Sequence, residues 1–400
     1  MGPGGDNIGQ LPIGFDLRGL QPGFKAHLGR GLGREAHELA LRLPLAAPDL
    51  ELVGLVQGGL EQPDPRYLAG RPRITIRLPW PRGKAQDRLL GQELALPLAI
   101  RGRLSLVHHV AHLDAPALSP VPTVVTVNDL ILSRQAGTLA KGGPARRLLR
   151  SLEAMAVRRA RLVVAISQAT GQEVEEYMGV NPNKVQVIPL AAGEQFKEVE
   201  DPGRLVDLRR RYDLREPYFL HVGGFDPRKN LVRLIRAWAS LGKGGKERPR
   251  LVLAGPTRDR AQVAPVEKAV AEKGLRNRVS FIGAVDDGDL PLLYSAAQAL
   301  VFPSLYEGFG LPALEAMACG CPVLAARTTS LPEVVGEAGL YFDPLDPRGI
   351  ASAVNRLRGE PGLRDELRAK GFAQAALFTW DKTAEQLAQA YYQVLKGEAR

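Results

Sequence analysis

Residues 307–315 read Glu307-Gly-Phe-Gly-Leu-Pro-Ala-Leu-Glu315, which sets two carboxylates eight positions apart around a glycine-rich loop. The apolar run at 299–303 comes just before it and predicts a buried parallel strand. Pro312 suits the first turn of a helix, and Gly320 suits its end. A strand, glycine loop and helix start of this kind direct backbone N–H groups and the positive end of a helix dipole at an anion, usually a phosphate.

The two glutamates flank this predicted phosphate site. Because carboxylates repel phosphate, Glu307 and Glu315 are expected to accept hydrogen bonds from hydroxyl groups on either side of it. A sugar nucleotide has that order of groups: hexose hydroxyls, then a diphosphate, then ribose hydroxyls. The alternative is a solvent-facing loop whose glutamates only cap the helix. That alternative fits Glu315, but it does not explain Phe309 between two glycines.

The length of 400 residues is too great for one hydrophobic core and predicts two domains. The composition, 45% hydrophobic and 24% charged, is typical of a soluble globular protein. No run of 18 apolar residues occurs, and the first residues lack the features of a signal peptide. Cys319 and Cys321 are too close for an ordinary disulfide and lack zinc-site spacing. A cytoplasmic protein is therefore expected.

The net charge of +10 is concentrated in one part of the chain. From Arg66 to Arg161, 17 Lys and Arg residues stand against 5 Asp and Glu, a local charge of +12. Nucleic acid, an anionic membrane or an acidic substrate would each explain this excess, and a solvated basic surface is the alternative. The stretch has few aromatic residues and no nucleic-acid-binding motif, so a nucleic-acid partner is not expected.

Both halves of the chain alternate strand and helix patterns, which predicts two parallel sheets covered by helices on both faces. Strands are expected at 13–17, 50–56, 73–78, 104–108, 123–127, 162–166, 185–189, 218–222, 250–254, 279–282, 300–302, 323–325 and 340–342. Helices are expected at 33–43, 144–159, 168–178, 230–241, 262–273, 290–297 and, after Glu315, in three stretches that end with 380–395. The charged, turn-rich sequence at 190–216 predicts a linker.

A second motif, His221-Val-Gly-Gly-Phe-Asp-Pro-Arg-Lys-Asn230, follows a predicted strand and opens a predicted helix. Gly224 and its neighbour permit a tight turn, and Arg228 and Lys229 place two cations at a helix start. A helix dipole disfavours cations there unless an anion neutralises them, so the motif predicts a bound diphosphate. The alternative is an exposed turn whose charges face water.

These motifs resemble glycosyltransferase family 4, the retaining enzymes of the GT-B fold, and within it a mannosyltransferase-B-like branch. The resemblance covers most of 160–395, and its segments there are 219–231, 301–320, 330–334, 340–347 and 378–383. It is thinner in the first half, at 31–34, 124–130 and 164–170.

The resemblance implies two doubly wound α/β domains of Rossmann type that face a cleft. The implied divisions are an acceptor-binding domain at 1–198, a nucleotide-sugar-binding domain at 199–378 and a C-terminal helix at 379–400 that packs back on the first domain. Ligands of such sheets bind at the carboxyl ends of their strands.

The resemblance also implies roles for the two motifs. Arg228 and Lys229 would hold the donor diphosphate, Glu307 the hexose and Glu315 the ribose. The donor would further lie against the backbone of four loop residues: Gly308, Phe309, Gly310 and Leu311. Charge on the leaving diphosphate would be stabilised by these cations and amides. Retention would follow from front-side attack assisted by the leaving phosphate, without a covalent nucleophile.

Other sites are weaker. The histidines at 108, 109 and 112 could bind metal, take part in catalysis or pack; because similar family strands end in a histidine near the donor sugar, His108 is expected to contact sugar or assist acid–base chemistry. The loop at 29–33 is expected to bring Gly31 and Gly33 near the donor phosphates, with an ordinary turn as the alternative. Asp286, Asp287 and Asp289 could bind a metal, but they precede a helix and are interpreted as caps. No metal or other cofactor is expected.

Two positions depart from the family pattern. Asn128 stands where many relatives carry histidine in a His-Asp-Leu motif, and its amide cannot exchange a proton near pH 7. Glu35 stands where relatives usually carry an aromatic residue after Gly-Arg. Both departures fall in the half expected to bind the acceptor, so the acceptor of the family is not carried over.

The sequence thus predicts a retaining hexosyltransferase, with GDP-mannose as the expected donor and a glycan or lipid-linked hydroxyl as the acceptor. A sugar-nucleotide epimerase of the same fold is the alternative enzyme, and a non-catalytic nucleic-acid-binding protein is the alternative class. The basic helix expected at 144–159 carries an apolar stripe of Leu148, Leu152 and Met155. That stripe either packs in the core beside a solvated basic edge or docks the protein peripherally on the inner face of an anionic membrane.

Overall fold

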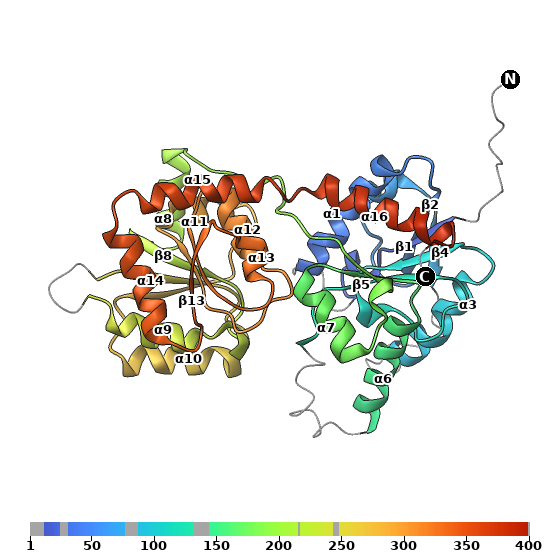
Figure 1. Ribbon diagram of the computed structural model, residues 1–400, viewed down its shortest axis with the longest axis horizontal. Helices are drawn as coiled ribbons and strands as arrows, with labels where there is room; N and C mark the ends of the chain where they lie inside the picture. The colour runs from blue at the N-terminus through green and yellow to red at the C-terminus, as the bar shows by residue number, and fades with distance from the viewer. Residues whose placement is uncertain are drawn as a thin grey trace. The chain divides into compact units, whose positions relative to one another are not determined.

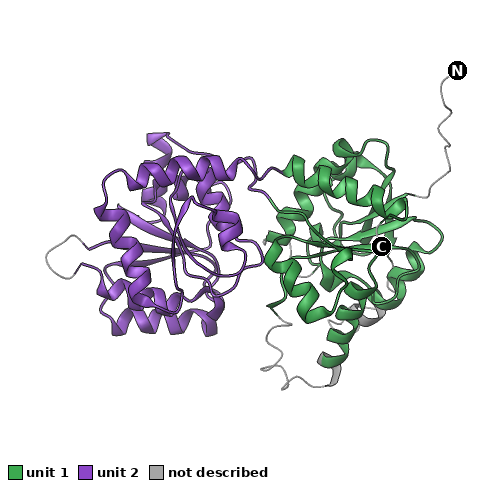
Figure 2. Ribbon diagram, in the orientation of Figure 1, with its two compact units in different colours: residues 1–190, 380–400 green, residues 191–379 purple. Residues whose placement is uncertain are grey.

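The computed structural model describes residues 12–24, 31–76, 87–131, 144–214, 217–242 and 248–398. The chain divides into two compact units (Figure 2). Unit 1 contains Met1–Leu190 and Trp380–Arg400, and unit 2 contains Ala191–Thr379. The first division thus falls eight residues before the boundary expected after residue 198, and unit 2 ends one residue after the expected 378.

Unit 1 is built on a parallel sheet that has seven strands in the described residues, in the order β3-β2-β1-β4-β5-β6-β7 (Figure 1). The strands are β1 (Ile13–Asp16), β2 (Leu52–Gln57), β3 (Arg73–Ile76), β4 (Leu106–His109), β5 (Thr123–Val127), β6 (Leu162–Ala165) and β7 (Val185–Val187). Their β-branched and aliphatic side chains are buried almost throughout, since helices cover a parallel sheet on both faces.

The helices of unit 1 include three that were expected from the apolar periodicity, α1 (Gly31–Ala46), α6 (Pro144–Arg159) and α7 (Gln168–Met178). The shorter helical elements are η1 (Arg18–Leu20), η2 (Tyr67–Gly70), the π-helix η3 (Asp87–Ala95), α3 (Leu96–Ile100), η4 (His112–Asp114) and η5 (Pro182–Lys184). The C-terminal helix α16 (Trp380–Leu395) packs against α1, which confirms that the end of the chain returns to the first domain (Figure 1).

Unit 2 repeats the architecture with a parallel sheet of six strands among its described residues, in the order β10-β9-β8-β11-β12-β13. The strands are β8 (Tyr218–Val222), β9 (Arg250–Ala254), β10 (Val279–Gly283), β11 (Leu300–Phe302), β12 (Val323–Ala326) and β13 (Gly339–Phe342). The helical elements are α8 (Pro202–Arg211), η6 (Pro227–Lys229), α9 (Leu231–Ser240), α10 (Arg260–Glu272), α11 (Leu290–Ala296), α12 (Leu311–Ala318), α13 (Leu331–Val335), α14 (Pro347–Gly359) and α15 (Leu363–Ala375).

The division between the two units falls at the start of the segment predicted as a linker, and the rest of that segment contains a helix that was not predicted. Asp201 caps α8 by accepting hydrogen bonds from the N–H groups of Gly203 and Arg204. Leu208 is the buried residue of this helix. With so little apolar surface to bury, α8 lacks the periodic pattern by which an amphipathic helix is recognised in sequence.

The two sheets share one topology. In each, the first strand along the sequence lies in the middle, and the chain adds two strands on one side before it crosses to the other. The crossing points are β1/β4 in unit 1 and β8/β11 in unit 2. Ligands of doubly wound sheets bind outside the carboxyl ends of the strands at such a point. In the described part of the chain, no helix is both long and apolar enough to span a membrane.

Candidate functional site

Two loops meet at the crossing point of unit 2, one after β8 and the other after β11. The N–H of Leu305 donates to the carbonyl of Arg228 at 2.7 Å, which ties the loops together. Asn230 reinforces the junction, since its side-chain amide donates to the carbonyls of Pro303 at 3.0 Å and Pro344 at 2.7 Å. The backbone of Asn230 is left-handed, with φ 59°, a conformation that asparagine tolerates better than most residues.

The junction carries a charged cluster built from both motifs. Lys229 Nζ lies 2.6 Å from Glu307 Oε1, and both side chains are buried. Arg228 lies 3.7 Å from Glu307 Oε2 and 2.8 Å from Asp226. The structure thus pairs both cations with carboxylates, so the argument that only an anion neutralises them was incomplete. The Arg228 side chain is still 31% exposed and can turn toward a ligand.

Glu307 is ionised in this environment. Burial would raise the pKa of its carboxyl, but the charges of Lys229 and Arg228 outweigh burial and hold the pKa below its ordinary value. A carboxylate is an acceptor of hydrogen bonds only. Glu307 therefore offers a negatively charged acceptor that is fixed at a cationic centre.

Two hydroxyl groups hold the loop that follows Glu307. Ser330 Oγ lies 2.9 Å from the carbonyl of Glu307 and 2.8 Å from that of Phe309, so its single proton is shared between them. The N–H of Glu307 donates to Thr329 Oγ1 at 3.1 Å. Thr329 adopts φ 44°, a strained conformation for a β-branched residue, and strain of this kind concentrates at functional sites. The sequence analysis missed both hydroxyls.

The end of this loop requires glycine. Gly310 has φ 106°, and a Cβ there would come within 2.7 Å of Leu331. Leu311 begins α12, so its N–H has no acceptor within the helix, and Pro312 has no N–H to offer. Gly308 and Phe309 complete the loop, with the Phe309 ring buried edge-on against Phe378 at 5.8 Å.

Glu315 lies one turn into α12 with its side chain buried. The phenol of Tyr294 donates to Glu315 Oε2 at 3.1 Å. A cap on the helix end would be exposed and would bond to backbone N–H groups. Glu315 is instead a buried carboxylate on the helix that carries the loop, so the capping alternative fails for it.

His221 is a further candidate that the sequence analysis quoted without assigning a role. It lies on β8, fully buried and stacked on Phe302 at 6.0 Å. Its Nδ1–H donates to the carbonyl of Val301 at 3.1 Å, and Nε2 lacks a partner among the residues described. Burial lowers the pKa of His221 to about 4, so the ring is neutral and Nε2 is an acceptor. The Phe302 ring also lies 5.2 Å from Lys229 Nζ.

The neighbouring strand ends approach one another closely. A Cβ on Gly255 would lie 1.8 Å from the carbonyl oxygen of Gly223, so no side chain fits there. Gly224 comes next and is open apart from the Asp226 carboxylate, which a Cβ would approach at 3.4 Å. The glycines thus leave backbone accessible beside the cationic cluster, as a phosphate-binding turn requires.

Unit 1 has its own polar cluster at its crossing point. Asp16 ends β1 and receives the guanidinium of Arg18 at 2.9 and 2.6 Å. His109 ends β4 and lies with Nδ1 3.0 Å from Asp16 Oδ2, while its Nε2 is unpartnered within the described ranges. Burial would raise the pKa of Asp16, but Arg18 and His109 outweigh it and keep the pKa well below its ordinary value. Asp16 and Arg18 were not identified from sequence.

His108 occupies a different environment from His109. It is buried in unit 1 with Nε2 2.9 Å from Thr126 Oγ1 and Nδ1 2.7 Å from the hydroxyl of Tyr391 on α16. Burial lowers its pKa to about 3. Both nitrogens are therefore occupied inside the protein, and this geometry does not support the expected contact of His108 with a sugar.

The glycines expected in the first loop belong to a helix. α1 begins at Gly31, two positions before the predicted start, and Gly33 lies in its first turn. Residues 25–30 lie outside the described residues. Gly31 is exposed and Gly33 is buried. Their backbone forms the N-terminal end of α1, and the expected approach of Gly31 and Gly33 to the donor phosphates stays a prediction.

The two departures from the family pattern are partners. Asn128 follows β5, and its amide donates to Glu35 Oε2 on α1. Glu35 is 2% exposed, and burial raises its pKa to about 8 although the hydrogen bond from Asn128 lowers it. Asn128 Oδ1 has no partner within the described part of the chain.

The aspartates before α11 do not cap it as predicted. Asp289 occupies the N-cap position without a side-chain cap, and its carboxylate instead binds Arg211 and the hydroxyl of Tyr212. The described residues contain no group of three His, Cys, Asp or Glu side chains placed to share a metal ion. Cys319 and Cys321 are buried, and burial raises the pKa of the Cys321 thiol to about 12.

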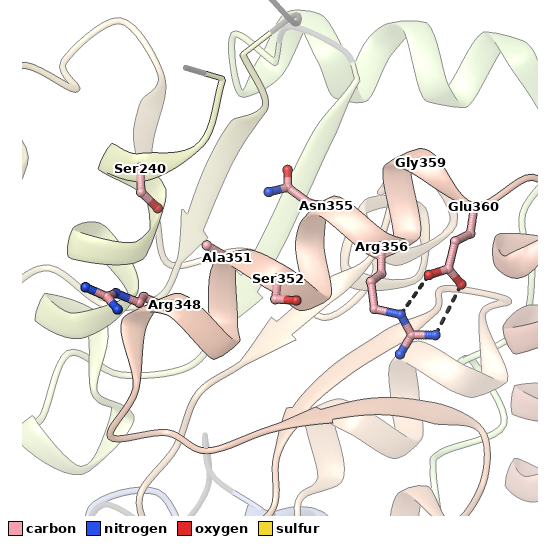
Figure 3. Close-up of a pocket in the computed structure, with 8 residues that line it drawn as sticks. All are labelled: Ser240, Arg348, Ala351, Ser352, Asn355, Arg356, Gly359 and Glu360. Atoms are coloured by element: carbon pink, nitrogen blue, oxygen red, sulfur yellow. Dashed lines mark hydrogen bonds and ion pairs between the residues drawn. The ribbon is translucent and has the colours of Figure 1, made fainter. Parts of the chain in front are cut away.

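Two surface hollows lie in unit 2. One, of about 480 Å³, lies between α9 and α14, where Arg356 and Glu360 form an ion pair at 2.8 Å (Figure 3). The other, of about 460 Å³, adjoins the charged cluster and is lined by Leu305, Arg327, Thr328, Tyr341, Phe342, Asp343, Pro344 and Leu345. The first contains none of the predicted site residues, whereas the second shares Leu305 with the loop junction.

Comparison with protein families matches both halves of the chain. The family described as Glycosyltransferase Family 4 matches residues 27–192, and the family described as Glycosyl transferases group 1 matches residues 209–374. The first match ends two residues past the end of the main segment of unit 1, and the second lies within unit 2.

Similar curated proteins are glycosyltransferases. O-antigen chain mannosyltransferase B of Escherichia coli is 35% identical over 58% of this chain and 60% of its own length. The serotype-specific mannosyltransferase WbdA of Escherichia coli is 35% identical over 60% of this chain, but the match spans only 29% of that protein. D-inositol 3-phosphate glycosyltransferase of Actinosynnema mirum is 31% identical over 70% of this chain and 67% of its own length.

Solved structures share the fold over nearly the whole chain. Sucrose-phosphate synthase from Thermosynechococcus elongatus matches with a TM-score of 0.76 at 25% identity, over 97% of this chain and 100% of that one. HepE of Anabaena, solved in complex with UDP and glucose, matches with a TM-score of 0.73 at 20% identity, over 96% of this chain and 100% of that one.

Proposed function

Because the chain belongs to glycosyltransferase family 4, we propose that it transfers a hexose from a nucleotide-diphosphate sugar to a hydroxyl group and retains the anomeric configuration. The observation that carries the proposal is the cluster of Arg228, Lys229 and Glu307 beside the start of α12. Two cations and the backbone at the start of α12 suit a diphosphate, and the ionised Glu307 suits a hexose hydroxyl.

The diphosphate is proposed to bind between Arg228, Lys229 and the backbone of Gly308–Leu311. Arg228 is partly exposed and supplies a fork of donors, whereas buried Lys229 is already oriented by Glu307. As the bond to the hexose breaks, negative charge grows on the departing diphosphate. Donors that are fixed before the reaction stabilise that charge without reorganisation.

Glu307 and Glu315 are proposed to divide the remaining recognition. Glu307 accepts a hydrogen bond from a hydroxyl group of the hexose, and Glu315, on α12, accepts one from a hydroxyl group of the ribose. Gly224 supplies backbone beside the diphosphate. The mannosyltransferases among the similar proteins favour GDP-mannose as the donor. A glycan or lipid-linked hydroxyl is the proposed acceptor.

In unit 1 we assign the acid–base or sugar-contacting role to His109 instead of His108. The Asp16 carboxylate orients Nδ1 of His109, which leaves Nε2 available within the described structure. His108 has both nitrogens engaged. Substitution of His109 by glutamine should lower turnover without changing nucleoside diphosphate binding, whereas His108→Gln should act mainly on thermal stability.

The donor is tested by thermal shift and calorimetry with GDP-, UDP- and ADP-sugars, followed by product analysis. GDP-mannose should stabilise the protein most, and a new α-glycoside should form when an acceptor is present. Turnover should survive EDTA, since the cations of the protein take the place of a divalent metal. If a sugar nucleotide were instead converted with no acceptor and no glycoside formed, the epimerase would replace the transferase.

A further inference from the structure

The pairing of Glu35 with Asn128 is unusual because the side-chain oxygen atoms of both residues have few hydrogen-bond donors beside them in the described structure. Glu35 is 2% exposed, and in the described part of the structure its hydrogen-bond donor is the Asn128 amide. A carboxylate in a dry environment ordinarily has several donors or a cation beside it, since burial of an unpaired charge is costly. The raised pKa of Glu35, about 8, reflects the same shortage.

The orientation of the Asn128 side chain follows from its partner. The Asn128 amide turns its NH₂ group toward Glu35 and donates to Oε2. This leaves Oδ1, a second acceptor, buried and unpartnered among the described residues. The pair therefore presents acceptors to any ligand that reaches it, and it lacks a cation from the described residues that would attract an anion.

The pair also lies where a doubly wound sheet binds its ligand. Asn128 directly follows Val127, the last residue of β5, and Glu35 lies in the second turn of α1, the helix that comes after β1. β1 and β5 are the two neighbours of β4, so the hydrogen bond connects the segments that follow the strands on either side of β4. This is the carboxyl edge of the sheet beside its crossing point.

We propose that Glu35 and Asn128 form an acceptor subsite that recognises two hydroxyl groups of an uncharged sugar. One hydroxyl donates to Glu35 and the other to Asn128 Oδ1, which supplies the missing donors. A phosphorylated acceptor is disfavoured there, because no cation of the described residues lies beside the pair to neutralise a phosphate that is brought out of water. The proposal rests on the proposed transfer reaction and narrows its acceptor to neutral glycans.

The test uses the full chain and the donor that stabilises it most. Methyl α-mannoside and mannose 6-phosphate serve as the neutral and phosphorylated acceptors, with Glu35→Gln and Asn128→Ala as variants. Glu38→Gln, three positions farther along α1, where Glu38 pairs with Arg42, is the matched control. Acceptor KM, kcat, donor hydrolysis without acceptor, nucleoside diphosphate affinity and melting temperature are measured for each protein.

The native protein should use the neutral acceptor in preference to the phosphorylated one. Each variant should raise the KM for the neutral acceptor by roughly 5-fold or more, as expected when a hydrogen bond to a buried group is lost. Nucleoside diphosphate affinity and donor hydrolysis should not change.

Two results separate this inference from the proposed function. Variants that still hydrolyse donor but keep the native acceptor KM would overturn the subsite alone, as would a native preference for mannose 6-phosphate. A native protein that binds no nucleoside diphosphate would overturn the transfer reaction itself. If Glu35→Gln fails to fold, Asn128→Ala decides, since among the described residues its side chain loses only the hydrogen bond to Glu35.

Discussion

The same position in two sheets of the same order carries two different ion pairs. At the end of β1 in unit 1, Asp16 binds Arg18, only two positions away, and both are buried, with side-chain exposures of 5% and 3%. Across β8 and β11 in unit 2, Lys229 binds Glu307, which is 78 positions away, and the neighbouring Arg228 is 31% exposed. The local pair holds a structure in place, whereas the distant pair joins two loops and keeps one cation within reach of solvent.

The difference shows what each unit contributes. The unit 1 cluster is closed around His109 and fixes its orientation, so its charges are used within the protein. The unit 2 cluster leaves Arg228 partly exposed, and there we propose that a phosphate competes with the carboxylates for Arg228 and Lys229. The two sheets share one topology, so the difference between the clusters comes from the placement of acidic and basic residues along the chain.

The largest effect is expected from Asp16→Ala. Removal of this carboxylate leaves Arg18 buried without its partner, which should destabilise the protein by roughly 3–5 kcal/mol. The free energy of unfolding is measured in urea, with exposed Glu51→Ala as the control. Nucleoside diphosphate affinity of the folded fraction should not change. A loss below about 1 kcal/mol would show that the closed pair is not structural.

The same pair predicts a pH dependence. The pKa of Asp16 is lower in the folded protein than in the unfolded chain, where it is about 3.9. The stability that the Asp16 carboxylate contributes is therefore fully present above that pH. As pH falls below that value the unfolded chain takes up the proton first, and the contribution is progressively lost. Native protein should therefore lose more stability between about pH 5 and pH 2 than Asp16→Asn does.

The unit 2 cluster is tested by Arg228→Ala and Lys229→Ala. Each substitution should weaken nucleoside diphosphate binding by roughly 1.5–3 kcal/mol, since each removes a charge-assisted contact. Arg236→Ala, an exposed arginine on α9, is the control and should bind normally. Calorimetry gives the affinities. Normal binding by the double variant would mean that these cations serve Glu307 and Asp226 only.

A smaller and more selective effect distinguishes the two glutamates. Glu307→Gln keeps the shape but weakens a hydrogen bond to the hexose, so kcat should fall by roughly 10-fold to 100-fold while nucleoside diphosphate affinity changes little. Glu315→Ala should chiefly weaken binding of ribonucleotides, by about 1 kcal/mol. Identical kinetic profiles for the two variants would contradict the division of roles. Leu363→Ala lies outside the cluster and should match native kinetics.

The smallest effect concerns α6, where the structure modifies the expectation from sequence. Ala156 and Val157 are buried, whereas Leu148 is 51% exposed and Leu152 and Met155 are half-buried, so the apolar stripe is not fully in the core. Arg147 and Arg158 lie exposed on the same helix, and residues 132–143 lie outside the described residues. We propose that this surface docks on anionic lipid.

Each arginine near an anionic surface contributes about 1 kcal/mol, so docking should be reversible and sensitive to salt. The native protein should sediment with anionic vesicles at low salt and ignore neutral vesicles. Arg147→Glu with Arg158→Glu should abolish sedimentation, whereas Arg276→Glu on exposed surface of unit 2 should not. Equal indifference of the native protein to both vesicle types would leave the basic surface without a membrane role.

Local sequence was sufficient for most of the fold. The spacing of apolar residues, together with the turn residues, predicted the bounds of seven elements as they are in the structure: β5, β8, β9, β11, α6, α7 and α16. Gly310 and Pro312 located the start of α12 because their backbone constraints act on their own position. The spacing of apolar residues did not predict α8, which buries little apolar surface. It also did not predict the π-helix η3, because a π-helix does not have the 3.6-residue period of an α-helix.

Only the tertiary structure revealed the partners. Asp16 and His109, and likewise Glu35 and Asn128, are 93 positions apart, and Lys229 and Glu307 are 78 apart. Crossover connections bring these residues to one sheet edge, and no local pattern encodes which side chains then come within 3 Å. Sequence therefore determined that Glu307 and Lys229 belong to loops after strands. Packing decided that they bind each other, that His108 bonds to Thr126 and Tyr391 whereas His109 bonds to Asp16, and that Glu35 has Asn128 as its neighbour.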